Sequence, residues 1–511
     1  MSRGERALSR VFGAALLGID GAAVEVEVRI SSQLPRMDIV GLADAAVRES
    51  ASRVRAAIAS AGLAFPDRRV TVNLAPAHLR KSDPSLDLPI AAAVLAASDQ
   101  LPPEALGGIG LMGELALDGR LRPVRGALAL CLALRDAGCR RVIVPVGNAG
   151  ESAFAPEVEV FPAENLLAVL HHLGGESPLA RAVSPVAASP ATLGPDLSDV
   201  RGQSAAKRAL EVACAGGHAV LLRGAPGCGK TMLARRLPGL LPPLDVGESL
   251  EVTRIHGAAG RLSEATPIVW ERPFRAPHHT ASPAGLLGGG SPPRPGEISL
   301  AHHGVLFLDE LPEFDRRCLE SLRQVLEDRR IVIARARVSC VFPAEFQLVA
   351  AANPCPCGWR GSGARDCRCD DAAVARYASR VSGPLLDRFD LQLELRSVPW
   401  SELDAPGAGP ESPAVRARVA EARRRQAERG HRSYRTNAEI PDSLLDAAVD
   451  PTAEARALLG RAVERLGLSA RAARRTLRVA RTIADLAGEL RTGAHAVAEA
   501  LGYRDRLPPK A

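Results

Sequence analysis

The sequence has few aromatic residues and no long hydrophobic run. Phe, Trp and Tyr make up only 3% of the 511 residues, so few side chains are available to stack on the bases of single-stranded nucleic acid. A membrane-spanning helix needs about 20 consecutive apolar residues, and no segment approaches that length. The most apolar stretch, residues 88–97, is better explained as a buried helix, so we expect no contact with a membrane.

The sequence also lacks a convincing export signal. Three arginines precede an apolar run at residues 11–19, which is how a short signal peptide begins. However, Asp20-Gly21 and the alternating segment 24–30 follow at once, and two strands joined at Asp20-Gly21 explain the pattern better. We therefore expect no cleaved signal and a cytoplasmic location. The ten cysteines should then be reduced thiols or metal ligands rather than disulfides.

Four parts of different composition follow one another, and together they predict an α/β multidomain protein. Residues 1–174 mix strand-like runs with Ala-rich helical runs, which indicates an α/β or α+β domain. Residues 175–196 are rich in Pro, Ser and Ala, as interdomain linkers are. Residues 197–400 carry nucleotide motifs, and residues 401–511 have an almost entirely helical pattern. The net charge of +7 permits binding to a polyanion without establishing it.

The strongest motif is GAPGCGKT at residues 224–231, which fits the phosphate-binding pattern G-x-x-x-x-G-K-[ST]. A strand-like run precedes it and a helical run follows, which is the context that this motif requires. We expect Lys230 to reach the β and γ phosphates of ATP, and the Thr231 hydroxyl to bind Mg²⁺. The nucleotide-binding residues would be Gly224, Ala225, Pro226, Gly227, Cys228, Gly229, Lys230 and Thr231.

Two further strand-like runs end in polar residues. In GVLFLDE, residues 304–310, four apolar residues lead into two acids. We expect Asp309 to position Mg²⁺ and Glu310 to polarise the attacking water. Asn353 ends the run 346–352 and could orient the same water, although Asn-Pro also commonly ends a strand.

Two arginines near the end of the motif region are candidates for transition-state stabilisation. Arg388 lies between acids just before another strand, where it could act as an arginine finger on a neighbouring subunit. The alternative is a surface ion pair of Arg388 with Asp387 or Asp390. Arg471 begins the amphipathic helix 468–488 and could bring a cation over the phosphates.

Taken together, the motifs resemble those of the AAA+ ATPases, and four segments resemble one branch of them. The similarity to the YifB/ComM family of Mg-chelatase-like AAA+ ATPases covers nearly the whole chain. It implies a Lon-protease-like N-terminal α+β domain, a P-loop AAA+ α/β core and a C-terminal helical lid domain. These segments are residues 255–262, 272–314, 352–358 and 382–391.

The resemblance also implies an activity and a role for each residue. ComM proteins form hexameric rings and act as DNA helicases that drive branch migration during recombination of incoming DNA. By position, Arg388 becomes the arginine finger that acts in trans, and Arg471 the second sensor, with Arg474 and Arg475 close enough to remain alternatives. The remaining assignments are Lys230 and Thr231 as Walker A, Asp309 and Glu310 as Walker B, Asn353 as the core sensor, and residues 200–203 against the adenine.

The N-terminal part resembles the Lon protease around its serine, with Ser85 near the position of the nucleophile. A Ser-Lys dyad needs a desolvated lysine as its base, but Leu128 stands where Lon has that lysine. Lys81 is the only lysine nearby and belongs to the same loop as Ser85. We therefore expect an inactive scaffold rather than a peptidase.

Two groups of residues could bind other metals. The loop 352–371 holds two C-x-C pairs, which either bind a structural zinc ion or remain reduced thiols. The adjacent pairs His278-His279 and His302-His303 are weaker candidates, because neighbouring side chains usually diverge. The four cysteines are Cys355, Cys357, Cys367 and Cys369.

Contacts with DNA could come from two basic segments. Residues 327–344 predict two strands with Arg335 and Arg337 between them, and this hairpin and the insert 256–300 would point into the pore of a ring. The run 417–435 is the most basic stretch, although Glu421 and Glu428 could make it an ordinary solvated helix face. For the hairpin a solvated basic surface is equally compatible, and for the run 417–435 a solvated face is the preferred interpretation.

The preferred hypothesis is an ATP-driven, hexameric DNA translocase that uses ATP and Mg²⁺ and binds branched or single-stranded DNA without sequence specificity. The alternative is a protein-remodelling ATPase of the Mg-chelatase-subunit type. A third hypothesis, an ATP-dependent protease, is opposed by Leu128.

Overall fold

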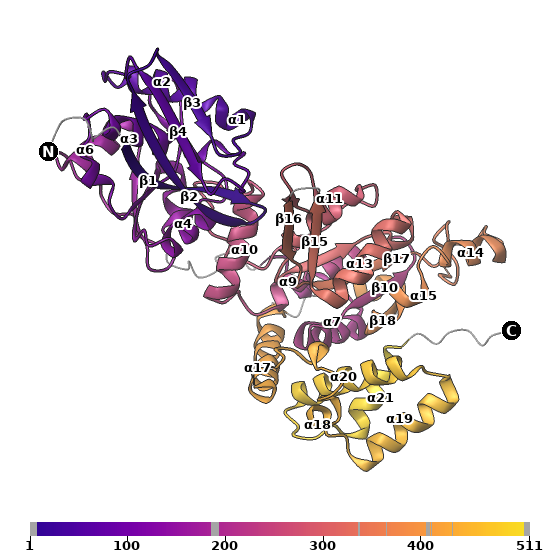
Figure 1. Cartoon of the computed structure of the whole chain (residues 1–511). Helices are drawn as coiled ribbons and strands as arrows, with labels where there is room; N and C mark the ends of the chain where they lie inside the picture. The colour runs from indigo at the N-terminus through magenta and orange to yellow at the C-terminus, as the bar shows by residue number, and fades with distance from the viewer. Residues whose placement is uncertain are drawn as a thin grey trace.

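The computed structural model describes residues 8–184, 194–335, 338–363, 365–404, 409, 411–431 and 433–504. Two separate sheets and a helical C-terminal region make up this part of the chain (Figure 1). No helix in these ranges is long and apolar enough to cross a membrane.

The N-terminal sheet has seven strands in the order β3-β4-β2-β1-β5-β8-β9. The strands β1, β2 and β4 pair antiparallel, and the remaining pairs are parallel. The alternating segment 24–30 lies within β2, where Val24, Val26 and Val28 are fully buried, as its pattern predicts. The strands are β1 Leu8–Leu17, β2 Asp20–Ser31, β3 Arg36–Val40, β4 Arg69–Ala75, β5 Ile109–Leu111, β8 Arg141–Pro145 and β9 Glu159–Ala163.

The predicted position of the first turn is wrong by two residues. Leu17 pairs with Asp20, so the turn consists of Gly18 and Ile19 rather than Asp20-Gly21. Gly18 adopts φ +64, which glycine tolerates best. Ile19 is 2% exposed and belongs to the apolar cluster of the second sheet, so the turn packs against another part of the molecule.

Helices cover both faces of the N-terminal sheet. The helix over 88–97 is buried along its whole length, as predicted. Two-residue strands at Glu114–Leu115 (β6) and Leu121–Arg122 (β7) form a small separate ladder. The helices are α1 Ala45–Arg48, α2 Ser50–Ser60, α3 Asp87–Ala97, α4 Ala127–Asp136, α5 Ala149–Ser152 and α6 Leu166–Gly174.

The second sheet has five parallel strands in the order β11-β14-β17-β10-β18. The carboxyl ends of parallel strands lie at one edge of a sheet, and ligands bind there in α/β folds. The strands are β10 Val220–Gly224, β11 Phe274–Arg275, β14 Val305–Leu308, β17 Gln347–Ala352 and β18 Leu391–Leu395. The helices around them are α7 Ser204–Gly216, α8 Lys230–Ala234, α9 Leu237–Leu240, α10 Val246–Ala258, α13 Arg316–Asp328 and α15 Gly383–Leu386.

A hairpin projects from this core beside the N-terminal sheet, and a short insert that contains α11 lies next to the hairpin (Figure 1). The strands β15, Arg330–Arg335, and β16, Val338–Pro343, confirm the two predicted strands. Arg337 lies outside the described residues, and the side chain of Arg335 is not described. The insert contains α11 Pro283–Leu287, β12 Gly288–Gly289, β13 Arg294–Pro295 and α12 Glu297–Leu300.

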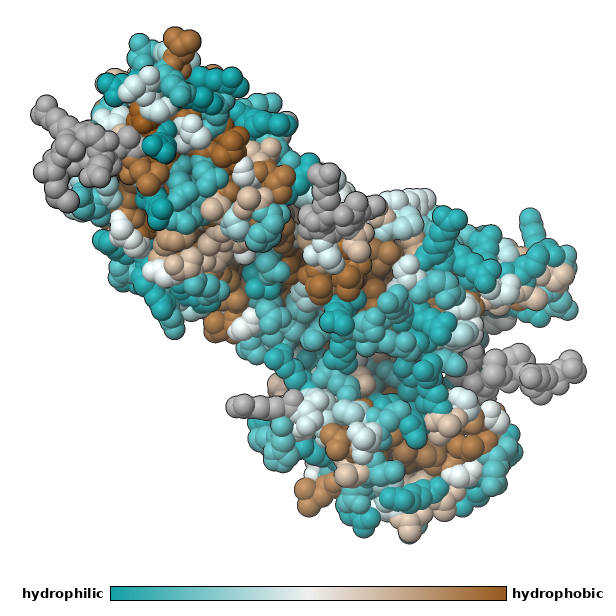
Figure 2. Space-filling model, in the orientation of Figure 1, coloured by the Kyte–Doolittle hydropathy of each residue, from teal (hydrophilic) through white to brown (hydrophobic). Residues whose placement is uncertain are grey.

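The C-terminal region is helical, as predicted, and packs below the second sheet (Figure 1). Its helix α17 lies against α7. The face of the molecule in Figure 2 is mostly hydrophilic, with apolar patches over the N-terminal sheet and near the centre. The helices are α16 Trp400–Leu403, α17 Ser412–Gly430, α18 Leu445–Val449, α19 Ala453–Leu466, α20 Ala470–Ala487 and α21 Ala494–Gly502, whereas α14, Asp371–Ala378, precedes β18 and belongs to the core.

Candidate nucleotide-hydrolysis site

The phosphate-binding loop connects β10 to α8, with the predicted strand before it and a helix after it. Gly227 and Gly229 adopt φ +80 and +95, a region that side chains disfavour. Gln203, from the segment expected near the adenine, donates its Nε2 to the carbonyl of Cys228 in this loop at 3.2 Å. The glycines of the loop therefore permit its shape, and a residue 25 positions earlier in the chain contacts it.

Lys230 lies at the centre of the loop and is only 8% exposed. Its Nζ donates to the carbonyl oxygens of Gly224 at 2.7 Å and Ala225 at 2.9 Å, and to Oδ1 of Asn353 at 3.1 Å. Burial lowers the pKa of Lys230 from its ordinary value, and nearby Asp309 acts in the opposite direction. Phosphate oxygens could replace the carbonyl oxygens as acceptors of this ammonium group.

The predicted Mg²⁺ ligands come together at the carboxyl edge of the second sheet. Thr231 Oγ1 donates to Asp309 Oδ2 at 2.7 Å. Asp309 follows β14, whereas Thr231 belongs to the first turn of α8. A hydroxyl and a carboxylate are the oxygen ligands that Mg²⁺ prefers beside phosphates, so the donor set fits this ion.

Glu310 has a partner that the sequence did not identify. Its Oε2 lies 3.1 Å from Nδ1 of His279. Glu310 itself adopts φ +53, an unfavourable conformation for a residue with a side chain. The carboxylate therefore occupies a constrained position beside the Mg²⁺ ligands and remains about half exposed.

The pairing of β11 with β14 explains the contact between His279 and Glu310. The two strands are parallel, with Arg275 opposite Leu306. His279 and Glu310 each lie four residues beyond this pair, at the same edge of the sheet. The sequence analysis considered His279 only as a metal ligand, and the signal that would have revealed its role was the neighbourhood of the two strands.

Arg388 is paired, but its partner differs from the predicted ones. Its guanidinium donates to Glu327 on α13, and to the carbonyl oxygen of Pro384 at 2.5 Å. Arg388 is only 4% exposed, so the hypothesis of a surface pair with Asp387 or Asp390 is wrong on both location and partner. Desolvation lowers the pKa of Arg388 from its ordinary value.

Of the three candidates for the second sensor, Arg471 shares an acidic partner with the side chain of Arg388. Its Nη2 is 3.7 Å from the same Oε1 of Glu327. Arg474 instead pairs with Asp442 at 2.7 Å. Arg475 pairs with Asp390 at 2.8 Å and also donates to the backbone carbonyl of Arg388 at 2.7 Å. The structure therefore brings Arg388 and Arg471 together through one carboxylate.

These arginines lie at the opposite edge of the sheet from the phosphate-binding loop. The first residue of β18, Leu391, pairs with Val220, the first residue of β10. Arg388 precedes β18, whereas the loop follows the last residue of β10. The length of a five-residue strand, about 13 Å, separates the two edges. Lys230, Thr231, Asp309, Glu310 and Asn353 thus form one group, and Arg388 lies outside it.

Comparison with known proteins assigns this architecture to a family. Models for "Magnesium chelatase, subunit ChlI", "Subunit ChlI of Mg-chelatase" and "Magnesium chelatase, subunit ChlI C-terminal" match residues 196–403, 26–148 and 409–504. Competence protein ComM of Haemophilus influenzae is 43% identical, and the match covers 97% of each chain. The chain belongs to the YifB/ComM family of Mg-chelatase-like AAA+ proteins.

Other relatives are equally similar along their whole length. Protein YifB of Escherichia coli, described as uncharacterized, is 44% identical over 508 residues, and the match covers 98% of each chain. An uncharacterized protein of Mycobacterium tuberculosis is 46% identical over 503 residues, which cover 98% of this chain and 99% of the relative. Both relatives thus match this chain over nearly the whole length of each protein.

In this YifB/ComM-type chain, the two residues considered for a Lon-like dyad are both engaged elsewhere. The Nζ of Lys81 donates to three backbone carbonyl oxygens, among them that of Leu74 at 2.9 Å. The hydroxyl of Ser85 is fully buried and donates to the carbonyl of Ala14 at 2.8 Å. Leu128 is fully buried on α4. Neither Lys81 nor Ser85 is arranged as a base facing a nucleophile.

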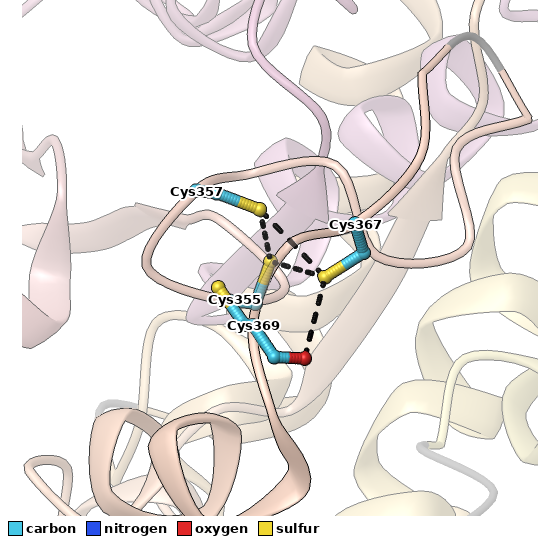
Figure 3. A group of neighbouring side chains, drawn as sticks. All are labelled: Cys355, Cys357, Cys367 and Cys369. Atoms are coloured by element: carbon cyan, nitrogen blue, oxygen red, sulfur yellow. Dashed lines mark hydrogen bonds between the residues drawn. The ribbon is translucent and has the colours of Figure 1, made fainter.

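The four cysteines of the loop after β17 converge on one point (Figure 3). Cys355 Sγ lies 3.4 Å from that of Cys357 and 3.7 Å from that of Cys367, and Cys357 and Cys367 are also 3.7 Å apart. With Cys369, all four Sγ atoms lie within 4.8 Å of one another. Backbone N–H groups of Trp359 and Arg368 lower the pKa of Cys357 to about 6.

The histidine pair at 302–303 does not diverge as expected. The rings lie 3.9 Å apart, and both Nε2 atoms are 3.0 Å from Oε2 of Glu251. However, Nδ1 of His302 accepts the backbone N–H of Glu345 at 3.0 Å, so the proton of a neutral ring lies on Nε2. A protonated Nε2 cannot bind a metal, so the ring of His302 is held by hydrogen bonds rather than available as a ligand.

The basic run on α17 has the acidic partners that its spacing predicts. Arg424 pairs with Glu421 at 2.8 Å and with Glu428 at 2.5 Å, and Arg425 pairs with Glu421 at 3.0 Å. These contacts lie within a single helix, on a face that is largely exposed. They favour a solvated face over a DNA-binding surface for this part of the run.

Proposed function

We propose that this protein is a Mg²⁺-dependent AAA+ ATPase that works as a hexameric DNA translocase and promotes branch migration during recombination of incoming DNA. The observation that carries the ATPase part is one group of side chains at the carboxyl edge of the second sheet. Lys230, Thr231, Asp309, Glu310 and Asn353 come from three separate segments, and one chain thus supplies the groups that would bind the phosphates, Mg²⁺ and the attacking water.

Each of these residues has a distinct part in the mechanism. Lys230 binds the β and γ phosphates, and Thr231 and Asp309 hold Mg²⁺, directly or through water. Bound Mg²⁺ neutralises charge that develops on the phosphate oxygens. Glu310 accepts a hydrogen bond from the attacking water, and Asn353, held by Lys230 at 3.1 Å, orients that water toward the γ-phosphate.

The position of Arg388 supports the proposed hexameric ring, in which each subunit would complete the ATP site of its neighbour. Because Arg388 lies at the amino edge of the sheet, it is separated from the phosphates of its own chain by the sheet itself. An arginine finger at this edge can act only on a nucleotide that a neighbouring subunit binds. Arg471 shares Glu327 with Arg388, so it belongs to the same interface and would also act in trans.

We assign four parts to the chain on this basis. Residues 1–174 form a Lon-protease-like domain, 175–196 a linker, 197–400 the AAA+ core with its insert at 256–300, and 401–511 a helical lid. The engaged dyad residues and Leu128 support the absence of peptidase activity from the first domain. We assign ATP and Mg²⁺ to the core as its cofactors, and a structural zinc ion to the four cysteines.

Two observations favour different substrates. The family relative from Haemophilus influenzae is named a competence protein, and the net charge of +7 suits a DNA partner in the cytoplasm. Conversely, the three matching models all derive from a magnesium chelatase subunit, which favours a protein-remodelling ATPase as the second candidate. We give preference to DNA because relatives over the full length include the competence protein.

The test is the steady-state ATPase rate of the full-length protein without DNA, and with single strands, duplex or a four-way junction. The variant Glu310→Gln serves as the control for contaminating ATPases. We expect DNA to stimulate the rate and raised salt to abolish the stimulation, because phosphate contacts are electrostatic. A rate that no DNA changes, but that Glu310→Gln abolishes, would transfer preference to the protein-remodelling ATPase.

A further inference from the structure

The sulfur positions in the cysteine loop match those around a tetrahedral metal. Four thiolates at about 2.3 Å from a zinc ion lie about 3.8 Å apart. The three Sγ–Sγ contacts of 3.4, 3.7 and 3.7 Å among Cys355, Cys357 and Cys367 are close to that value. The N–H groups of Trp359 and Arg368 bond to Cys357 Sγ, an arrangement that stabilises a thiolate ligand.

Other chemistries of clustered cysteines fit this geometry less well. A disulfide requires an S–S distance of about 2.05 Å, which is far shorter than any of these contacts. An iron–sulfur cluster distributes its thiolates over several irons, and four sulfurs within 4.8 Å of one another leave no room for it. Neutral thiols gain little from converging, because S–H is a weak donor and S a weak acceptor.

The cysteine loop is in direct contact with the nucleotide site. Cys355 is fully buried and follows Asn353, the acceptor of the Lys230 ammonium group, by two residues. Gly358, three residues after Cys355, lies so close to the phosphate-binding loop that a Cβ there would be 2.7 Å from Cδ of Pro226. The same Cβ would be 3.8 Å from Cγ of Asn353. One loop therefore contacts both sides of the site.

The composition of the cysteine loop indicates that the loop needs a cross-link to keep its shape. Gly358, Gly361 and Gly363 all adopt positive φ, and the segment between the two cysteine pairs contains no helix or strand in its described residues. Few backbone hydrogen bonds would hold such a segment against Pro226 and Asn353 without a cross-link between its ends. A metal that joins all four cysteines supplies that cross-link.

We propose that the four cysteines bind one Zn²⁺ per chain and that the zinc-bound loop positions Pro226 and Asn353 for ATP binding and hydrolysis. Four thiolates leave no open position on the metal, so its role is structural. The effect on hydrolysis rests on the proposed ATPase activity, whereas the zinc content and the effect on ATP binding do not.

The metal is tested on the full-length protein, purified without chelators and analysed for metals by mass spectrometry. We expect one zinc per chain, lost in Cys357→Ser and Cys369→Ser and retained in Cys139→Ala, which changes a buried cysteine outside the loop. Protein produced with Co²⁺ should show the visible absorption of a tetrahedral thiolate site. Iron in place of zinc, or no metal and no Co²⁺ spectrum, would overturn the assignment.

The positioning role is tested by comparing zinc-loaded protein with protein stripped by a chelator, and then with zinc restored. We expect removal to weaken the binding of a fluorescent ATP analogue and to lower kcat, each by about 10-fold to 10²-fold, because misplacement of about 1 Å has effects of this size. Stripping the intact protein avoids dependence on variants that fail to fold. Unchanged binding and kcat after stripping would refute positioning while leaving the zinc site intact. If zinc-loaded protein binds the analogue but hydrolyses no ATP, the ATPase proposal fails. The positioning role of the zinc-bound loop is then tested by the change in analogue binding alone.

Discussion

Nδ1 of His279 lies 3.1 Å from Oε2 of Glu310, so the carboxylate expected to act on the attacking water is held by a residue from the neighbouring strand segment. His279 is 28% exposed and its ring also lies beside His278, at 4.1 Å between centroids. Through α11 and β12, the insert 256–300 continues directly from this histidine. Any movement of the insert would therefore reach Glu310 through a single side chain.

We predict that His279→Ala lowers kcat for ATP hydrolysis about tenfold and leaves KM for ATP nearly unchanged. The reason is that Glu310 acts on water rather than on ATP binding, and a misdirected base loses part of a contribution worth about 10² to 10⁴. Steady-state kinetics on the purified variant measure both parameters. His278→Ala is the matched control, because Nδ1 of His278 bonds to Thr280 at 2.8 Å instead. Equal losses in both variants would show that the pair only supports the local fold.

The proposed action of Arg388 in trans leads to a second prediction, which uses two inactive variants. Arg388→Ala should lower kcat by about 10³ or more, as the loss of an arginine finger does, and Glu310→Gln should remove hydrolysis in its own site. When the two proteins are mixed and allowed to exchange subunits, an ATP site with intact Glu310 can face a subunit with intact Arg388. We therefore expect ATPase activity to return on mixing.

The mixing experiment separates the two arrangements of Arg388. If Arg388 served the site of its own chain, every site in a mixed ring would still lack one group, and no activity would return. Glu327→Gln provides a further comparison, because it removes the partner of Arg388 while retaining the arginine. This variant should keep more activity than Arg388→Ala.

The contact between Gly358 and Pro226 allows a third prediction. In Gly358→Ala, the new Cβ would lie 2.7 Å from Pro226 Cδ, so the phosphate-binding loop must shift, and we expect weaker ATP binding by about tenfold. Gly363→Ala is the matched control, since Gly363 also has positive φ but no atom lies within 4 Å of its added Cβ. Both variants should retain zinc. Titration with a fluorescent ATP analogue distinguishes them, and equal affinities would contradict the contact.

Local patterns were sufficient to predict most of the hydrolysis site. The apolar runs before Gly224, Asp309 and Asn353 are parallel strands, and the rule that ligands meet at their carboxyl ends correctly brought these residues together. The hairpin at 330–343 was also evident from its alternation. These features depend on neighbours in sequence, which is why the sequence sufficed.

The features that escaped prediction depend on distant contacts. His279 meets Glu310 only because β11 pairs with β14, and Arg388 meets Glu327 across 61 residues of sequence. The first turn lies at Gly18 and Ile19 rather than at the predicted Asp20-Gly21, because Ile19 is buried among apolar residues of the second sheet. Spacing along the chain carries no direct information about such pairs.

The buried carboxyl group of Glu151 leads to a prediction about pH. Burial raises the pKa of Glu151 to about 7 in the folded protein, although hydrogen bonds from the N–H of Leu128, at 3.1 Å, and from the side chain of Asn148 act in the opposite direction. An exposed glutamate in the unfolded chain has a pKa of about 4.3. Between these two pH values the folded state binds a proton that the unfolded state has lost. The stability that Glu151 contributes is therefore fully present below about pH 4.3 and decreases as the pH rises toward about 7.

Replacement of Glu151 by glutamine removes this titration and keeps the oxygen that accepts from Leu128. We therefore expect Glu151→Gln to raise the Tm more at pH 8 than at pH 5, with a difference of about 3 kcal/mol or less in unfolding free energy between the two conditions. Glu104→Gln, at an exposed position, should shift the Tm equally at both pH values. Thermal unfolding followed by circular dichroism measures both variants. If the stabilisation by Glu151→Gln does not grow between pH 5 and pH 8, Glu151 is already ionised at pH 5 in the folded protein. Only a carboxyl group with an unshifted pKa would make the substitution insensitive to pH in this range.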